Sequence, residues 1–260
     1  MTIVVAAAAP DGIALATDSR TTHQKGPAHR IRTESARKVF SVGATAIATY
    51  GVAEIGGRSI AGLMDVAGRT IGADDEPEEV GTKLAQFFGG LLRRENSTFL
   101  KSGVLGFLVA GYTRQRRGVL LDVLVPATDG EAVRPIPKVG TTRRGMVYRG
   151  STGFLRRVFE GTDRDELDRI ADSSERDALA KLSPRIGQLR YELNTPNSLQ
   201  DAVDLAAFAV RFTIDMERFT DGTLSNPGAA PGCGGKIQLA AVRPSGVEWI
   251  AEPTVRLTML

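Results

Sequence analysis

The sequence is poor in the residues that build disulfides and metal sites. It contains one cysteine, Cys233, and only two histidines, His23 and His29. A single cysteine excludes an internal disulfide and fits a reducing environment, so we expect a cytoplasmic protein. The sequence has neither a paired-cysteine spacing nor an HExxH segment, and it therefore predicts no metal site.

Long apolar runs and nucleotide-binding motifs are also missing. The opening run, TIVVAAAA, is far shorter than the roughly 18 apolar residues of a membrane span. No basic segment precedes it, so it lacks the layout of a signal peptide. The sequence contains no GxGxxG and no GxxxxGK[ST] segment. These absences predict a chain that neither enters a membrane nor uses a cofactor.

Charge of either sign is spread thinly. The formal net charge is +3, and pairs of arginines are scattered at 93–94, 116–117, 143–144 and 156–157 without forming a basic block. Such scattered pairs favour a solvated surface over a nucleic-acid partner, which we do not expect. With 42% hydrophobic and 24% charged residues, the composition is that of a globular protein, and the length fits one domain over 1–260.

The first residues have the pattern of a β-hairpin. Two apolar segments, 2–9 and 13–17, flank the turn Pro10-Asp11-Gly12, and Asp-Gly accepts the positive backbone angles that tight hairpins need. Because the strands of a hairpin return to their start, we expect Asp18 to lie close to Thr2.

The rest of the chain alternates between strand-like and helical patterns. Gly and Pro among polar residues predict a loop, and apolar residues at three- and four-residue spacing predict helices. In the first half we expect a loop over 22–36, strands over 38–42 and 44–51, helices from 54 and over 76–95, and strands over 102–112 and 117–127. A turn at 150–153 then leads into a helix, and a charged helical insertion follows over 161–197, broken by Pro184. Last come a helix over 198–219, capped by Ser198, and strands over 236–242, 247–252 and 253–259. Hairpin connections rather than regular β–α alternation predict an α+β fold of antiparallel sheets with helices outside.

Thr2 stands directly behind the initiator methionine. If Met1 is removed, which methionine aminopeptidase does when the second residue is small, Thr2 carries a free α-amine beside its hydroxyl. The amine, with a pKa of about 7.7–8.0, can take the proton of the hydroxyl and activate it as a nucleophile. Many proteins begin with Met-Thr, so this position alone indicates little.

Several features near Thr2 occur together and in order. They are a threonine opening the first strand, a DG turn, the segment TDSR at the end of the second strand, a lysine leading the strand KVFSV, and a glycine ending the next strand. In this combination the segment 2–58 resembles proteasome β-type subunits, which are N-terminal-nucleophile (Ntn) hydrolases, and bacterial proteasome-like homologues among them. The later segments RGSTGFLRRVFE, SLQDAVDLAAFAV and GGKIQLAAVRPSGVEWI resemble the family more loosely, and 75–145 and 161–197 resemble it weakly. The resemblance implies a four-layer αββα sandwich, with two antiparallel sheets flanked by helices.

The resemblance also implies roles for five residues. Thr2 matches the nucleophile, and Asp18 matches the acid that positions the catalytic lysine. Lys38 matches that lysine, whose charge would lower the pKa of the Thr2 hydroxyl and amine. Gly51 matches the glycine whose N–H stabilises the oxyanion. Ser151 matches the serine that hydrogen-bonds the terminal amine.

Other positions leave alternatives open. Lys25, His23 and His29 share the loop before Lys38 and are rivals for a basic role, and that loop is longer than is usual in the family. Ser151 could instead cap the following helix. The family's C-terminal acid is matched by Glu217, by Asp221 or by neither. Cys233 stands where the serine that accompanies this acid in the family would be, and it is more simply structural than nucleophilic. As substrate-binding candidates we name four residues near the nucleophile: Arg20, Thr22, Ala48 and Thr49.

The resemblance implies a threonine-type peptidase that acts on peptides or unfolded proteins inside a homo-oligomeric ring or stacked-ring chamber. The apolar helix segments IAGLMDVAG and AFAVRFTI would supply subunit contacts, and a separate ATPase or activator would be needed for unfolding substrates. Two alternatives remain: a small-molecule amidase with the same nucleophile, since a fold does not fix a substrate, and an inactive ring-forming scaffold.

Overall fold

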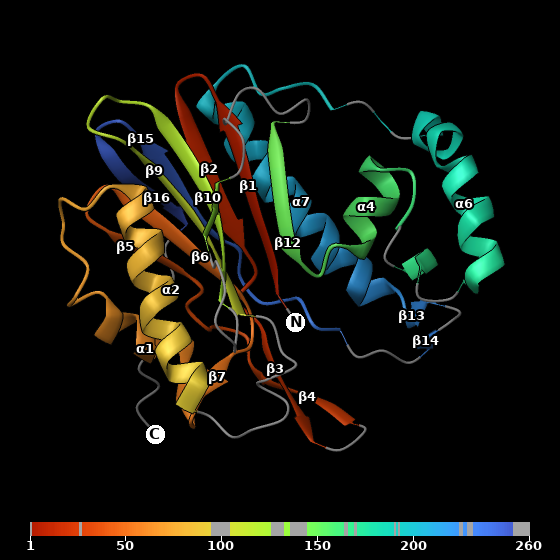
Figure 1. The fold of residues 1–260 in the computed structure, drawn as a ribbon, viewed down its shortest axis with the longest axis horizontal. Helices are drawn as coiled ribbons and strands as arrows, with labels where there is room; N and C mark the ends of the chain where they lie inside the picture. Colours follow the sequence, from red (N-terminus) through yellow and green to blue (C-terminus); the bar gives the residue numbers. More distant parts are fainter. Residues whose placement is uncertain are drawn as a thin grey trace.

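Two five-stranded antiparallel sheets form the body of the protein (Figure 1). The structure is a computed structural model and describes residues 2–25, 28–94, 105–125, 133–135, 145–163, 166–168, 171–189, 191, 193–223, 226–227 and 231–251. The first sheet has the strand order β12 (Met146–Gly150), β1 (Ile3–Ala9), β2 (Gly12–Thr17), β15 (Gln238–Arg243) and β16 (Gly246–Ala251). The second has the order β11 (Val133–Pro135), β10 (Gly118–Val125), β9 (Leu105–Tyr112), β6 (Thr45–Gly51) and β5 (Val39–Val42). Three two-stranded sheets comprise β3 (Thr21–Lys25) with β4 (Ala28–Thr33), β7 (Glu54–Ile55) with β8 (Arg58–Ser59), and β13 (Gly222–Thr223) with β14 (Asn226–Pro227). The expected α+β fold with antiparallel sheets is confirmed.

The first hairpin has the predicted form. β1 pairs with β2 from Val4 opposite Thr17 to Ala9 opposite Gly12, so the residues after β2 come back to the beginning of β1. Both strands are buried along their whole length, because their two faces are covered by different clusters of apolar side chains.

Three apolar clusters hold the elements together. One contains side chains from both large sheets, among them Val4, Leu15 and Ala48, so the sheets pack against each other there. A second joins the other side of the first sheet to α4 (Gly153–Phe159) and α7 (Leu199–Phe219). A third joins the other side of the second sheet to α1 (Ile60–Ala67) and α2 (Pro77–Arg94). Alternating side chains of each central strand thus face two different cores.

The helix ends follow from local sequence. Pro77 opens α2, glutamates occupy its first turn and arginines its last, as the helix dipole favours. Ser198 caps α7 as predicted, in a reciprocal capping box with Asp201. Four apolar residues of α1, Ile60, Leu63, Met64 and Ala67, are buried in the core, whereas Ala61 and Val66 are half-buried. On α7, by contrast, Phe208 is 54% exposed and stacks on Phe212.

Three sequence predictions are wrong in detail. Residues 22–36 do not form a simple loop, because most of them belong to the hairpin β3–β4, which projects from the body in Figure 1. The helix expected from residue 54 begins at Ile60, after the small hairpin β7–β8, with Ser59 as its cap. Pro184 does not break the charged stretch, since α6 (Ser173–Ile186) contains it and the 3₁₀ turn η1 (Gly187–Leu189) follows. The strand expected over 253–259 lies outside the described residues.

Across the part of the chain that the structure describes, the helices are too short or too polar to traverse a bilayer.

Candidate active site

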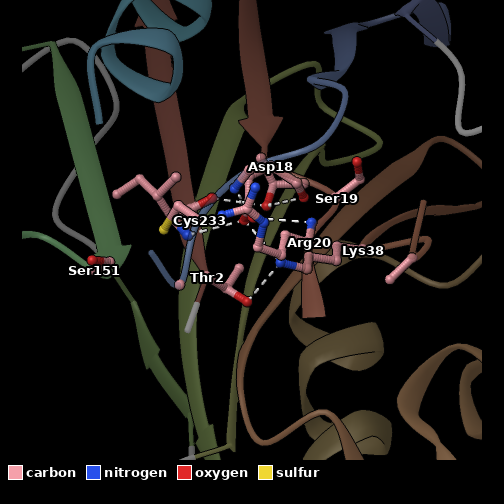
Figure 2. A network of polar contacts seen from close by, with 12 residues as sticks. Thr2, Asp18, Ser19, Arg20, Lys38, Ser151 and Cys233 are labelled. Atoms are coloured by element: carbon pink, nitrogen blue, oxygen red, sulfur yellow. Dashed lines mark hydrogen bonds and ion pairs between the residues drawn. The ribbon is translucent and has the colours of Figure 1, made fainter. Parts of the chain in front are cut away.

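The hydroxyl of Thr2, the ammonium of Lys38 and the carboxylate of Asp18 form a continuous chain of contacts (Figure 2). Lys38 Nζ donates to Thr2 Oγ1 at 2.9 Å and to Asp18 Oδ1 at 2.8 Å. The exposed fractions are 7% for Thr2, 3% for Lys38 and 0% for Asp18. An unpaired charge at so buried a position would be very unfavourable. The ion pair therefore holds the side chains of Lys38 and Asp18 in one arrangement.

Strand ends bring these three residues together. Thr2 stands directly before β1 and Asp18 directly after β2, so the hairpin places them side by side. Lys38 stands directly before β5, in the other sheet, and reaches across to both. The prediction that Asp18 lies close to the start of the chain is confirmed.

Asp18 receives more donors than the lysine alone. Its Oδ1 accepts the N–H of Ile3 at 3.2 Å, and its Oδ2 accepts the N–H groups of Arg20 at 3.1 Å and Gly234 at 3.0 Å. Burial raises the pKa of the Asp18 carboxyl above its ordinary value, while the charge and hydrogen bond of Lys38 and the backbone donors act in the opposite direction.

The backbone of Thr2 is held by the turn after β12. Ser151 N–H donates to the carbonyl oxygen of Thr2 at 2.7 Å. Gly150, just before it, has a φ of +88°, and a Cβ at this position would lie 1.8 Å from that same oxygen. Only glycine therefore allows this close approach without a shift of the backbone.

Ser151 is joined to the C-terminal loop through Glu217. Its hydroxyl donates to Glu217 Oε1 at 2.6 Å, while Oε2 accepts the N–H groups of Gly232 and Cys233 at 2.6 and 2.7 Å. Of the two acids left open by the sequence, Glu217 thus contacts Ser151, and Asp221 is exposed. The alternative that Ser151 caps the next helix is not what the structure has, since Thr152 occupies the cap position.

Cys233 lies beside this group with 1% of its surface exposed (Figure 2). Burial, together with the negative charges of Asp18 and Glu217, raises the pKa of the Cys233 thiol well above its ordinary value. A thiol that stays protonated is a weak nucleophile, so the structure supports the packing role that the sequence suggested.

Gly51 and Thr49 lie at the end of β6, the strand that pairs with β5. Gly51 is exposed and has a φ of +95°. The Thr49 N–H donates to the carbonyl of Lys38 at 3.0 Å, which ties this strand end to the lysine. Thr49 Oγ1 is buried and has no hydrogen-bond partner among the described residues. A buried hydroxyl without a partner is costly.

The other substrate-binding candidates are placed differently. Ala48 has no exposed surface and belongs to the core between the sheets, so its side chain cannot touch a substrate there. Arg20 pairs with Glu34 at 2.8 Å and donates to the carbonyl of Pro231 at 3.1 Å, which makes it a link between two loops. Thr22 lies in β3, opposite Ile31. Lys25, His23 and His29 belong to the same hairpin, and their side chains lie outside what the structure describes.

Among the described side chains, no group of three or more His, Cys, Asp or Glu residues is arranged to hold a metal ion. The arrangement of Thr2, Lys38 and Asp18 can instead activate the Thr2 hydroxyl, because a base can remove its proton while the neighbouring Lys38 Nζ stabilises the oxygen. Sequence reasoning missed one buried polar residue close to it, Gln238, although a glutamine inside the apolar segment KIQLAAV is a visible signal.

A comparison with models of known protein families finds no match for this chain, and a comparison with curated proteins finds none either.

Proposed function

We propose that this protein is a threonine-type peptidase of the N-terminal-nucleophile class, in which Thr2 becomes the first residue after Met1 is removed. The observation that carries the proposal is the contact of Lys38 Nζ with both Thr2 Oγ1 and Asp18 Oδ1 at the very start of the chain. A hydroxyl in hydrogen-bond contact with a buried cation is more acidic than an ordinary threonine hydroxyl.

In the proposed reaction, the free α-amine of Thr2 takes the proton from Oγ1 while Oγ1 attacks the carbonyl carbon of the scissile amide. The amine then gives this proton to the leaving nitrogen, and the carbon–nitrogen bond breaks, which leaves the acyl group as an ester on Thr2. A water molecule, deprotonated by the same amine, hydrolyses the ester and restores the hydroxyl.

The surrounding groups support separate parts of this reaction. The N–H of Gly51 is assigned to the oxyanion, because the positive φ at this exposed strand end needs a glycine and leaves room for a carbonyl. Asp18 pairs with Lys38 and holds its Nζ in contact with Thr2. Ser151 holds the carbonyl of Thr2 and, with Glu217 behind it, stands next to where the amine forms. Thr49, two residues before Gly51 in β6, stays a substrate-binding candidate through its place at this strand end.

The architecture and assembly are part of the same proposal. The apolar clusters support the four-layer αββα sandwich of this class. The layers follow one another as helices α4 and α7, the first sheet, the second sheet, and helices α1 and α2. We assign the exposed Phe208 on α7 to a contact in a homo-oligomeric ring or stacked ring. The substrate is a peptide or an unfolded protein, and a separate ATPase or activator supplies any unfolding.

The test is hydrolysis and covalent labelling by the full-length protein as purified. With peptides, unfolded casein and small linear amides as substrates, we expect peptide hydrolysis and labelling of Thr2 by a threonine-directed inhibitor, both lost in Thr2→Ala. Thr82→Ala, which removes an exposed hydroxyl on α2, is the matched control and keeps both. Turnover of small amides without peptides would replace the peptidase by an amidase, and no turnover or labelling at all would leave a scaffold.

A further inference from the structure

Gln238 is a buried polar side chain that the proposed reaction does not use. It is the first residue of β15, it is 2% exposed, and it lies opposite Thr17 in β2, the residue before Asp18. An amide this deeply buried needs hydrogen-bond partners, and the partners that it has point to a role.

All the hydrogen bonds of this side chain go to one short segment, residues 36–39. Its Oε1 accepts the backbone N–H groups of Lys38 at 2.9 Å and Val39 at 3.0 Å. Its Nε2 donates to the carbonyl oxygen of Ala36 at 2.5 Å. The orientation of the amide follows from these partners, because two N–H groups need an acceptor and a carbonyl needs a donor.

These bonds connect the two large sheets at the candidate site. β15 belongs to the sheet that carries Thr2 and Asp18, whereas Lys38 leads β5 in the other sheet. Gln238 therefore fixes the backbone of Lys38 relative to the strand that ends at Asp18. The carbonyl of Lys38 is held on its other side by the Thr49 N–H, so both polar groups of this peptide position have a partner.

The segment before Lys38 has a second anchor on the same sheet. The backbone carbonyl of Ser19 accepts the Ala36 N–H at 2.8 Å. The Ser19 hydroxyl donates to the Glu34 carbonyl at 2.6 Å. Ser19 thus fixes the backbone of the residues before Lys38, and Gln238 fixes the backbone of Lys38 itself.

We propose that Gln238 is a positioning residue for Lys38, an inference that rests on the proposed function. The ammonium of Lys38 must contact Thr2 Oγ1 and Asp18 Oδ1 at once, and the long lysine side chain passes any shift of its backbone on to Nζ. Among the described residues, the hydrogen bonds of the Gln238 side chain go to the backbone of Ala36, Lys38 and Val39 and not to Thr2. In this role, Gln238 keeps the Nζ of Lys38 close to the hydroxyl and the amine of Thr2.

The test is steady-state hydrolysis and Thr2 labelling by the full-length protein carrying Gln238→Met, which keeps the length of the side chain and removes its hydrogen bonds. We expect kcat to fall about tenfold or more with KM unchanged, because small displacements of catalytic groups affect the chemical step. The pH at half-maximal labelling should rise, because a retracted cation no longer lowers the pKa of the Thr2 amine. A purely structural loss would lower the active fraction without moving this pH.

Two further variants complete the experiment. Gln238→Glu keeps an acceptor oxygen for the N–H groups of Lys38 and Val39 but loses the donor to the Ala36 carbonyl. We therefore expect a kcat between those of Gln238→Met and the natural protein, and this variant also carries the test if Gln238→Met does not fold. Gln200→Met, on the exposed side of α7, is the matched control and should change nothing. An unchanged kcat and pH profile in both Gln238 variants would overturn the positioning role, whereas an inactive natural protein would overturn the proposed function instead.

Discussion

At the scale of single residues, the buried pair of Lys38 and Asp18 decides both stability and reactivity. Removing one partner leaves the other as a buried charge without a counter-charge. The resulting loss in the free energy of unfolding is larger than the net contribution of the intact pair. The same pair is the source of the positive charge beside Thr2. The effects on stability and on reactivity can therefore be separated by comparing a single substitution of Lys38 with a double substitution of Lys38 and Asp18.

Lys38→Met should abolish Thr2 labelling and lower the free energy of unfolding by about 3–5 kcal/mol, because Asp18 is left buried and unpaired. The double variant Asp18→Asn/Lys38→Met should regain part of this stability but no activity. Urea unfolding at a fixed protein concentration measures both. The control is Lys83→Met, which breaks the more exposed pair with Asp75 and should cost about 1 kcal/mol or less. Equal losses at the two lysines would contradict the account.

The raised pKa of Asp18 predicts a second step in the pH profile. The reaction needs the ionised carboxylate and the neutral amine, so acid protonates the amine first and Asp18 later. Because burial raises the pKa of Asp18 above 3.8, this second loss begins at a higher pH than for an ordinary aspartate. The logarithm of the labelling rate should fall with a slope of about one per pH unit below the pKa of the amine and of about two below that of Asp18. Circular dichroism at each pH checks that the fold persists, and a slope that stays near one down to pH about 4 would count against a need for ionised Asp18.

Cys233 should be unreactive in the folded protein. Its thiol is buried beside two carboxylates that raise its pKa, so a disulfide reagent at pH about 8 should modify it only after unfolding in urea. Cys233→Ser should retain Thr2 labelling. Rapid modification of the native thiol, with loss of labelling, would instead assign the thiol to the reaction.

At the scale of secondary-structure elements, the site depends on turns as much as on strands. The turn after β12 reaches the carbonyl of Thr2 only because Gly150 has a positive φ and no side chain. The turn therefore belongs to the site although it contributes no reacting group.

Gly150→Ala should reduce Thr2 labelling by about a hundredfold, since the added Cβ would meet the Thr2 carbonyl oxygen and displace the nucleophile. The matched control is Gly57→Ala in the small hairpin β7–β8. Gly57 has a similar φ of +73° but open space around it, so only the backbone strain of about 1–2 kcal/mol is shared. Labelling rates of the two purified variants decide the matter, and similar rates would show that the close approach to Thr2 is unimportant.

How far the sequence predicts these elements depends on the kind of pattern. The hairpin of β1 and β2 and the helix α7 were predictable, because Asp-Gly turns and capping serines are local signals. The hairpin β3–β4 was not, since its strands, TTHQK and AHRIRT, are mostly polar and flank Gly-Pro, a pattern that is also typical of a loop. For the site, the hairpin pattern placed Asp18 near Thr2, and the family resemblance added Lys38. The contact of Ser151 with Glu217 and that of Gln238 with Lys38 join positions far apart in sequence.

At the scale of the whole molecule, the two large sheets are joined near the site by polar contacts as well as by apolar packing. Tyr50 and Asp122 belong to the second sheet and Arg149 to the first. Tyr50 donates to Asp122 Oδ1 at 2.6 Å, and Arg149 donates to Asp122 Oδ2 at 2.7 Å. Burial and the neighbouring Asp122 raise the pKa of Tyr50, so its hydroxyl stays a donor.

Tyr50→Phe should lower the free energy of unfolding by about 1–3 kcal/mol, because one oxygen of the buried Asp122 loses its donor. Tyr112→Phe is the matched control in the same sheet, since Tyr112 donates no hydrogen bond among the described residues, and it should be nearly neutral. Thermal or urea unfolding of the two variants provides the comparison. A neutral Tyr50→Phe would mean that the hydrogen bond from Tyr50 to Asp122 contributes nothing to stability.

The central claim is that removal of one residue turns Thr2 into an N-terminal nucleophile. Mass spectrometry of the N-terminal peptide, before and after treatment of the purified protein with a threonine-directed covalent inhibitor, tests it most directly. The account predicts a peptide that begins at Thr2 and carries the inhibitor on that residue. A peptide that retains Met1, or an inhibitor bound elsewhere in a protein that still hydrolyses amides, would contradict it.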